Sequence, residues 1–151
     1  IVSFYDYNCS YCKKGDKYLS QLLESDSKIK VILKPFPILG EYSMYAAKIA
    51  LAVYKLEPSK FKAIHEGLMN SSQPTKTMIT ELLTTEDLDP SKVIEESESQ
   101  EIKDVINKNF SLAGNLRIQG APAYIINGKL MPGLLNLNAL QQIVSESREQ
   151  H

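Results

Sequence analysis

The most informative segment of the sequence is Ile1-Val2-Ser3-Phe4-Tyr5-Asp6-Tyr7-Asn8-Cys9-Ser10-Tyr11-Cys12-Lys13-Lys14. Its first five residues are mostly β-branched or aromatic, which indicates a buried strand. Asn8 or Cys9 then caps a helix that we expect to run to about Glu24. The only two cysteines of the protein, Cys9 and Cys12, therefore lie where a strand passes into a helix. This layout is typical of a dithiol redox site.

The composition is that of an ordinary globular domain. The chain has 151 residues, of which 43% are hydrophobic and 23% charged, and its net charge is -1. That length suffices for one domain with a hydrophobic core. The charge predicts no broad basic surface for nucleic acid or an anionic membrane, and no apolar run reaches the roughly 18 residues of a membrane span. Because the chain begins inside an expected strand and shows no signal peptide, we expect an N-terminal segment to be missing.

The rest of the chain alternates between strand and helix patterns. Residues 29–36 read as a second strand, which prolines end. From residue 41 to about 117, apolar residues recur at helical spacing. Residues 121–131 return to strand character around Asn127-Gly128, a strong hairpin signal, and Asn136 caps a last helix. This order predicts an α/β domain, residues 1–40 and 118–151, with an all-helical domain, residues 41–117, inserted into it.

The spacing of the two cysteines favours disulfide exchange. A thiolate is the nucleophile in that reaction, and a helix N-terminus favours the negative charge of Cys9. Cys12 lies one turn further on and can attack a mixed disulfide at Cys9. We therefore expect Cys9 to be the exposed, attacking thiol and Cys12 the more buried, resolving one. Ser10 and Tyr11 would tune the pair through their hydroxyls or the local backbone.

The cysteine pair has two other interpretations. Half of a zinc site would need two further ligands, but the remaining candidates are only His65, which we expect to be a solvated helix residue, and the terminal His151. Two incidental buried thiols would not need the polar Ser10-Tyr11 spacer. Disulfide exchange requires neither a metal nor an organic cofactor.

Three segments together resemble a known family. They are Phe4 to Lys13, the segment Phe36-Pro37-Ile38-Leu39-Gly40, and the segment from Gly120 to Gly128 that contains Ala121-Pro122. In that order they are similar to the DsbA-like thiol–disulfide oxidoreductases of the thioredoxin superfamily, especially to the DsbA-related and ScsC-like bacterial proteins. The resemblance covers nearly the whole chain and implies a thioredoxin-like α/β fold with an inserted helical domain.

The resemblance also implies site residues. Pro122 would be a cis-proline beside Cys9, and the loop with Ala121 would hold an extended substrate peptide by backbone hydrogen bonds. The family commonly has a buried acid six residues before the first cysteine, where this chain has Ser3. We expect another group, or water, to take the proton of Cys12.

The expected function is disulfide formation in exported proteins, in the bacterial periplasm or another extracytoplasmic space. Its partners would be cysteine-containing exported proteins and a membrane redox partner, with a homo-oligomer possible through the missing N-terminal segment. A disulfide isomerase or reductase of the same family is the main alternative. A non-redox peptide-binding or chaperone module and a glutathione-using transferase are alternatives of other classes, and neither explains both cysteines.

Overall fold

The computed structural model describes residues 1–150, so His151 lies outside the described part of the chain. A four-stranded sheet forms its centre, in the order β2-β1-β3-β4. The strands are β1 (Val2–Tyr5), β2 (Ile32–Pro35), β3 (Ala123–Ile126) and β4 (Lys129–Pro132). β1 is parallel to β2 and antiparallel to β3, which is antiparallel to β4. β2 is shorter than the strand expected over residues 29–36, because it begins at Ile32 and ends at Pro35.

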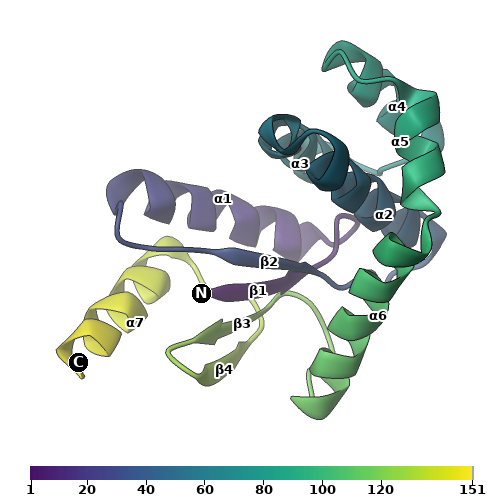
Figure 1. Cartoon of the computed structure of the whole chain (residues 1–151). Coiled ribbons are helices and arrows are strands. Elements are labelled where there is room, and N and C mark those ends of the chain that lie inside the picture. The colour runs from purple at the N-terminus through teal and green to yellow at the C-terminus, as the bar shows by residue number, and fades with distance from the viewer. Residues whose placement is uncertain (151) are drawn as a thin grey trace.

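The helices fall into three groups along the chain (Figure 1). α1 (Ser10–Ser25) follows β1, and α7 (Leu137–Glu149) closes the described chain. Between β2 and β3 lie α2 (Glu41–Leu56), the short 3₁₀ helix η1 (Pro58–Lys60), α3 (Phe61–Asn70), α4 (Lys76–Thr85), α5 (Pro90–Ser97) and α6 (Gln100–Asn115). Within residues 1–150, none of these helices combines the length and apolar character that crossing a bilayer requires.

The two faces of the sheet are covered by different helices. Successive strand residues point to opposite faces, so Tyr124 and its neighbour Ala123 enter different clusters. Tyr124 packs with leucines of α1 and α7, whereas Ala123 and Phe4 pack with Ala113 of α6. α1 and α7 therefore share one face, and α6 covers the other.

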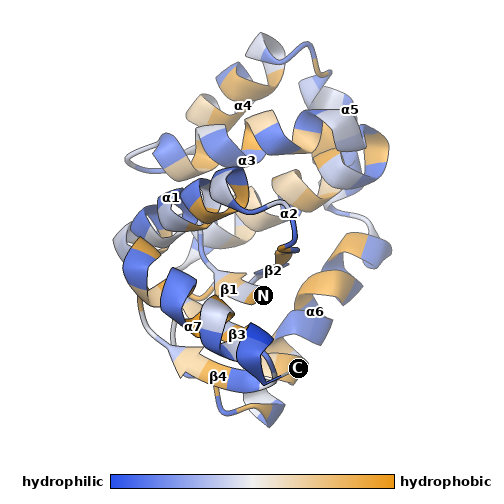
Figure 2. Ribbon diagram, turned by 90° about the vertical axis from the view of Figure 1, so that its left-hand side faces the viewer, coloured by the Kyte–Doolittle hydropathy of each residue, from blue (hydrophilic) through white to orange (hydrophobic). Residues whose placement is uncertain are grey.

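A third core joins the sheet to the helical block. Figure 2 shows α3, α4 and α5 gathered beyond one end of the sheet, with hydrophobic stretches interspersed along them. Buried side chains of this block cluster with Tyr5, Tyr7 and both cysteines. The α/β sheet with a helical insertion that the sequence predicts is thus confirmed, and the cysteine pair lies where the two parts meet.

The turn between β3 and β4 is the hairpin that the sequence predicts. Asn127 and Gly128 have φ values of 53° and 75°. Two consecutive residues with positive φ characterise a type I′ turn, whose twist matches that of paired antiparallel strands. The turn thereby fixes the register that places Ala123 opposite Pro132.

Candidate active site

Cys9 is the N-cap of α1. Its backbone is still extended, with φ −108° and ψ 119°, and its Sγ accepts a hydrogen bond from the Cys12 backbone N–H at 3.2 Å. The first N–H groups of a helix have no partner within the helix. Here one of them is directed at the sulfur, where the positive end of the helix dipole also favours a thiolate.

The pKa values of the two thiols are shifted in opposite directions. The pKa of the Cys9 thiol is lowered to about 6, chiefly by the hydrogen bond from the Cys12 thiol, with help from the backbone N–H groups of Cys12 and Tyr11. Burial and the charge of Asp6 act against this lowering. The same hydrogen bond, together with burial, raises the pKa of Cys12. Cys9 is thus the thiolate of the pair near neutral pH, and Cys12 keeps its proton.

The expectation that Cys9 is exposed is wrong. Cys9 is 7% exposed and Cys12 is 2% exposed, so both are buried. The reason is that Tyr5, Tyr7 and the helical block pack around the pair, and Ala121 packs against the same cluster. Cys9 is still the more accessible of the two, as the expected order of attack requires.

The loop before β3 lies against Cys9. The Ala121–Pro122 peptide bond is cis, which confirms the expectation from the family resemblance. The Cys9 Sγ lies 3.6 Å from the Ala121 carbonyl oxygen, and the Pro122 carbonyl accepts a hydrogen bond from the Gly133 N–H at 2.9 Å. Residues 112 positions apart in the sequence are therefore neighbours in the site.

Ser10 and Tyr11 lie on the surface between the cysteines. Both are exposed, Tyr11 to 60%, and the ammonium of Lys14 lies 5.6 Å from the Tyr11 ring centroid. The group of Tyr11 that acts on the Cys9 thiolate is its backbone N–H. Ser10 is not among the groups that shift the pKa of Cys9.

Asp6 joins residues 6–9 between β1 and α1, here called the cysteine loop, to the segment after β2 by hydrogen bonds. Its buried carboxylate accepts hydrogen bonds from the N–H groups of Ile38 and Leu39, at 2.9 and 3.0 Å. It also accepts from the Asn8 N–H and the Ser43 hydroxyl, each at 2.7 Å. Four donors on one carboxylate hold the Pro37–Gly40 loop beside the start of α1.

His65 is not solvated, contrary to the expectation from the sequence. It is 6% exposed, its ring stacks on Phe61, and both of its nitrogens have partners. Nδ1 lies 2.7 Å from the Tyr7 hydroxyl, and Nε2 lies 2.7 Å from Asp16 Oδ1. The helix α3 turns this residue toward α1 and the cysteine loop rather than toward water.

Asp6, Asp16 and His65 were missed as site residues. Asp16 follows Cys12 by four positions, a spacing that places both on one face of a helix, so helical periodicity could have found it. Ser3, at the position where the family commonly has an acid, is buried in β1 opposite Tyr124. The acids near the cysteines come instead from the loop and from α1.

Comparison with known proteins shows the family. The model of the DSBA-like thioredoxin domain matches residues 1–145. The chain belongs to this family of DsbA-like thioredoxin domains. Within it, Cys9 and Cys12 are the Cys-x-x-Cys pair of a thiol–disulfide oxidoreductase domain, and the fold is the thioredoxin-like one with a helical insertion.

Solved structures agree with this DsbA-like assignment. A periplasmic thioredoxin-like protein from Salmonella enterica serovar Typhimurium is 35% identical, with a TM-score of 0.87 over 97% of this chain and 82% of that one. The ScsC protein of Proteus mirabilis, in a compact conformation, is 32% identical, with a TM-score of 0.88 over 97% of this chain and 81% of that one. The resemblance to ScsC-like proteins is thereby confirmed.

A curated relative is longer than this chain. It is the probable disulfide bond formation protein D of Bacillus anthracis, which is 27% identical over 142 residues. The aligned region takes in 86% of this chain but only 65% of that protein.

Proposed function

We propose that this protein is a thiol–disulfide oxidoreductase that forms disulfides in exported proteins through Cys9 and Cys12. The observation that carries the proposal is the hydrogen bond from the Cys12 N–H to the Cys9 Sγ at the head of α1. This bond stabilises the thiolate, which exists only in the reduced form. Stabilising the reduced form makes a disulfide a stronger oxidant, as in the strongly oxidising members of this superfamily.

The exchange would begin on the oxidised Cys9–Cys12 pair. A substrate thiolate attacks the Cys9 Sγ, and the electron pair of the broken bond passes to the Cys12 sulfur, which takes up a proton. A second substrate thiolate then attacks the substrate sulfur of the mixed disulfide. The substrate leaves with a disulfide, and Cys9 leaves as the stabilised thiolate.

The surroundings of Cys9 fit this chemistry. The Ala121 carbonyl, 3.6 Å from the Cys9 sulfur, can accept a hydrogen bond from the backbone of an extended substrate, and Pro122 holds this loop against the site. Ser10 and Tyr11 tune the couple through the helix N-terminus. We assign substrate binding to Ala121 and Pro122 and tuning to Ser10 and Tyr11.

The location and partners follow from the same chemistry. Disulfides form and persist in oxidising compartments, and the relatives include a protein described as periplasmic and one described as a disulfide bond formation protein. We place this protein outside the cytoplasm, where a membrane redox partner reoxidises Cys9 and Cys12. An isomerase would instead need a reducing partner that keeps Cys9 and Cys12 reduced.

The test uses the full-length protein in two assays, oxidation of reduced ribonuclease and repair of scrambled ribonuclease. We expect oxidation to dominate, and Cys9→Ser to abolish it, while Ser111→Ala on the exposed face of α6 leaves it unchanged. Repair without oxidation would establish the isomerase. Peptide binding or glutathione conjugation that survives Cys9→Ser, with neither redox activity, would refute the proposal.

A further inference from the structure

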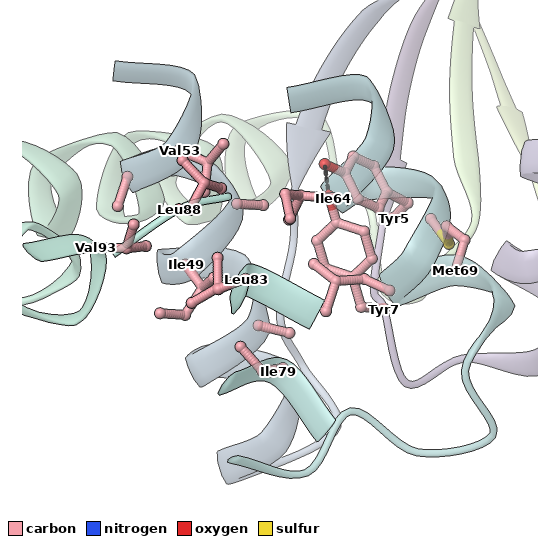
Figure 3. Close-up of a cluster of buried hydrophobic side chains, with 14 of the residues drawn as sticks. Tyr5, Tyr7, Ile49, Val53, Ile64, Met69, Ile79, Leu83, Leu88 and Val93 are labelled. Atoms are coloured by element: carbon pink, nitrogen blue, oxygen red, sulfur yellow. Dashed lines mark hydrogen bonds between the residues drawn. The ribbon is translucent and has the colours of Figure 1, made fainter. Parts of the chain in front are cut away.

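Four polar side chains form a continuous hydrogen-bonded chain that the exchange described above does not use; Tyr5, Tyr7 and His65 are buried, and Asp16 is partly exposed. The Tyr5 and Tyr7 hydroxyls are 3.2 Å apart, a link visible as the dashed line in Figure 3. The Tyr7 hydroxyl lies 2.7 Å from His65 Nδ1, and His65 Nε2 lies 2.7 Å from Asp16 Oδ1. The chain connects β1, the cysteine loop, α3 and α1.

The hydrogen bonds of this chain can all run in one direction, because each hydroxyl can donate or accept and the imidazole can carry its proton on Nε2. An ionised carboxylate can only accept, so Asp16 accepts from the Nε2–H of His65. In the tautomer that carries its proton on Nε2, Nδ1 accepts from the Tyr7 hydroxyl, whose oxygen accepts from the Tyr5 hydroxyl. A proton that enters at Tyr5 can therefore be passed on, bond by bond, to His65 Nδ1.

Both ends of the chain lie near Cys12, one on α1 and the other in the buried cluster that contains Cys12. Asp16 follows Cys12 by one helical turn on the same face of α1. Tyr5 belongs to the same buried cluster as Cys12. Burial raises the pKa of Tyr5 above its usual range, against the hydrogen bond with Tyr7, and the charges of Asp16 and Cys12 raise it further. Tyr5 therefore keeps its proton, and its pKa depends on the charge of Cys12.

Cys12 needs such a connection because it is 2% exposed. In the resolving reaction its thiol must lose a proton before the sulfur can attack, and in the oxidising direction its sulfur must gain one. Bulk water does not reach a group this deeply buried without an opening of the structure. A proton acceptor inside the protein removes that requirement.

We propose that the Tyr5–Tyr7–His65 chain carries the proton of Cys12, with Asp16 as the positioning residue that stabilises the protonated imidazole. The proposal rests on the order of attack assigned above. Cys12 gives its proton to the Tyr5 oxygen, while the Tyr5 and Tyr7 protons each move one place and His65 becomes an imidazolium. The Cys12 thiolate then attacks the Cys9 Sγ of a mixed disulfide, and the partner sulfur leaves with the electron pair. The oxidising direction runs the same steps backward.

Other charged groups surround this chain. Asp6 and Cys9 lie on the cysteine loop, and Tyr124 on β3 is influenced by the charges of Cys9, Cys12 and Asp16. Lys13 of α1 donates to the Ser71 carbonyl at 2.5 Å, at the end of α3. Of these groups, Tyr124 makes the best control, because it is buried and its pKa is raised by the charge of Cys12, but it is not a link of the chain.

The experiment mixes the reduced full-length protein with 5,5′-dithiobis(2-nitrobenzoate) and follows the two releases of coloured thiol by stopped flow. The first release reports attack by Cys9, and the second reports attack by Cys12 on the mixed disulfide. Tyr7→Phe removes the middle link and leaves the ring. At neutral pH we expect it to slow the second release by about tenfold or more and to leave the first unchanged. At about pH 10 hydroxide replaces the chain, so the two proteins should converge.

Three results would overturn the relay. They are an unchanged second release, a loss that is equal at all pH values, and an equal loss in Tyr124→Phe. Should Tyr7→Phe fail to fold, Asp16→Asn is compared with Asp26→Asn, which removes the same charge at the far end of α1. A faster second release in Asp16→Asn would show that Asp16 acts only as a repelling charge. A missing first phase in the wild type would instead refute the order of attack.

Discussion

Cys12 governs the acidity of Cys9, because its hydrogen bond is the largest cause of the lowered pKa of the Cys9 thiol. Cys12→Ala removes the thiol that donates this bond. We therefore expect the pKa of Cys9 to rise from about 6 toward the ordinary value of a thiol. The measurement is the ultraviolet absorbance of the thiolate as a function of pH, supported by the alkylation rate with iodoacetamide. A midpoint that stays near that of the wild type would show that the helix N-terminus acts alone.

Asp6 is the second residue whose removal gives a defined result. The Asp6 carboxylate accepts four hydrogen bonds, two on each oxygen. In Asp6→Asn an NH₂ group replaces one oxygen, so it faces two groups that also donate. We expect unfolding to become easier by about 2–3 kcal/mol. Because the Asp6 charge raises the pKa of Cys9, the same variant should also lower that pKa.

Urea denaturation and thiolate absorbance measure the two effects of Asp6→Asn separately. Asp89→Asn is the matched control, since Asp89 is an exposed N-cap that accepts one bond from Ser91, and asparagine caps about as well as aspartate. Equal losses of stability in both variants would contradict the role given to Asp6.

The residues that sequence could identify are those whose chemistry depends on local spacing. Cys9 and Cys12 could be assigned an order of attack because the helix start is visible in the sequence. The partners of His65 could not be identified from the sequence, because Tyr7 and Asp16 are 58 and 49 positions away. A helical histidine is buried or solvated according to what the fold places against it, and only the tertiary structure shows that.

At the scale of the elements, the contact between α1 and β3 depends on a glycine. A Cβ built on Gly15 would lie 2.4 Å from the Tyr124 hydroxyl oxygen and 3.3 Å from Leu134 Cδ1. Gly15→Ala should therefore cost about 1–3 kcal/mol of stability through overpacking, although alanine is the better helix former by about 1 kcal/mol. Thermal and urea denaturation measure the change.

Gly114 of α6 provides the control for Gly15, because a Cβ there meets no atom within 4 Å. Gly114→Ala should leave stability unchanged or raise it by up to about 1 kcal/mol. Adding Tyr124→Phe to Gly15→Ala removes the clashing oxygen and should restore part of the loss. A Gly15→Ala protein as stable as the wild type would contradict the close approach of α1 to β3.

Element boundaries were predictable where a turn or cap carries its own signal. Asn127-Gly128 gave the hairpin, because two positive φ values suit few other residue pairs. The strand expected over 29–36 begins only at Ile32, since pairing with β1 starts at Val2 opposite Ile32. Gly15 makes room for Tyr124, a requirement that no local sequence pattern contains.

At the level of the whole molecule, the lowered pKa of the Cys9 thiol sets how reduction of the Cys9–Cys12 disulfide depends on pH. The pKa of Cys9 is lowered on folding, so its thiolate stabilises the reduced protein fully above the pKa of the unfolded thiol. That contribution declines as the pH falls and is lost below about pH 6. The pKa of Cys12 is raised, so its contribution is present below the unfolded value and does not change across this window.

Redox equilibrium with glutathione, measured on the full-length protein between about pH 5 and pH 8, shows whether the Cys9 thiolate is stabilised in the reduced protein. Above about pH 6, reduction of the Cys9–Cys12 disulfide should take up one proton, and below it two, because Cys9 ionises there. We predict that the slope of the potential against pH halves at this point, with a potential well above the roughly −270 mV of thioredoxin. A constant slope over the whole range, or a potential as low as that of thioredoxin, would contradict a stabilised Cys9 thiolate.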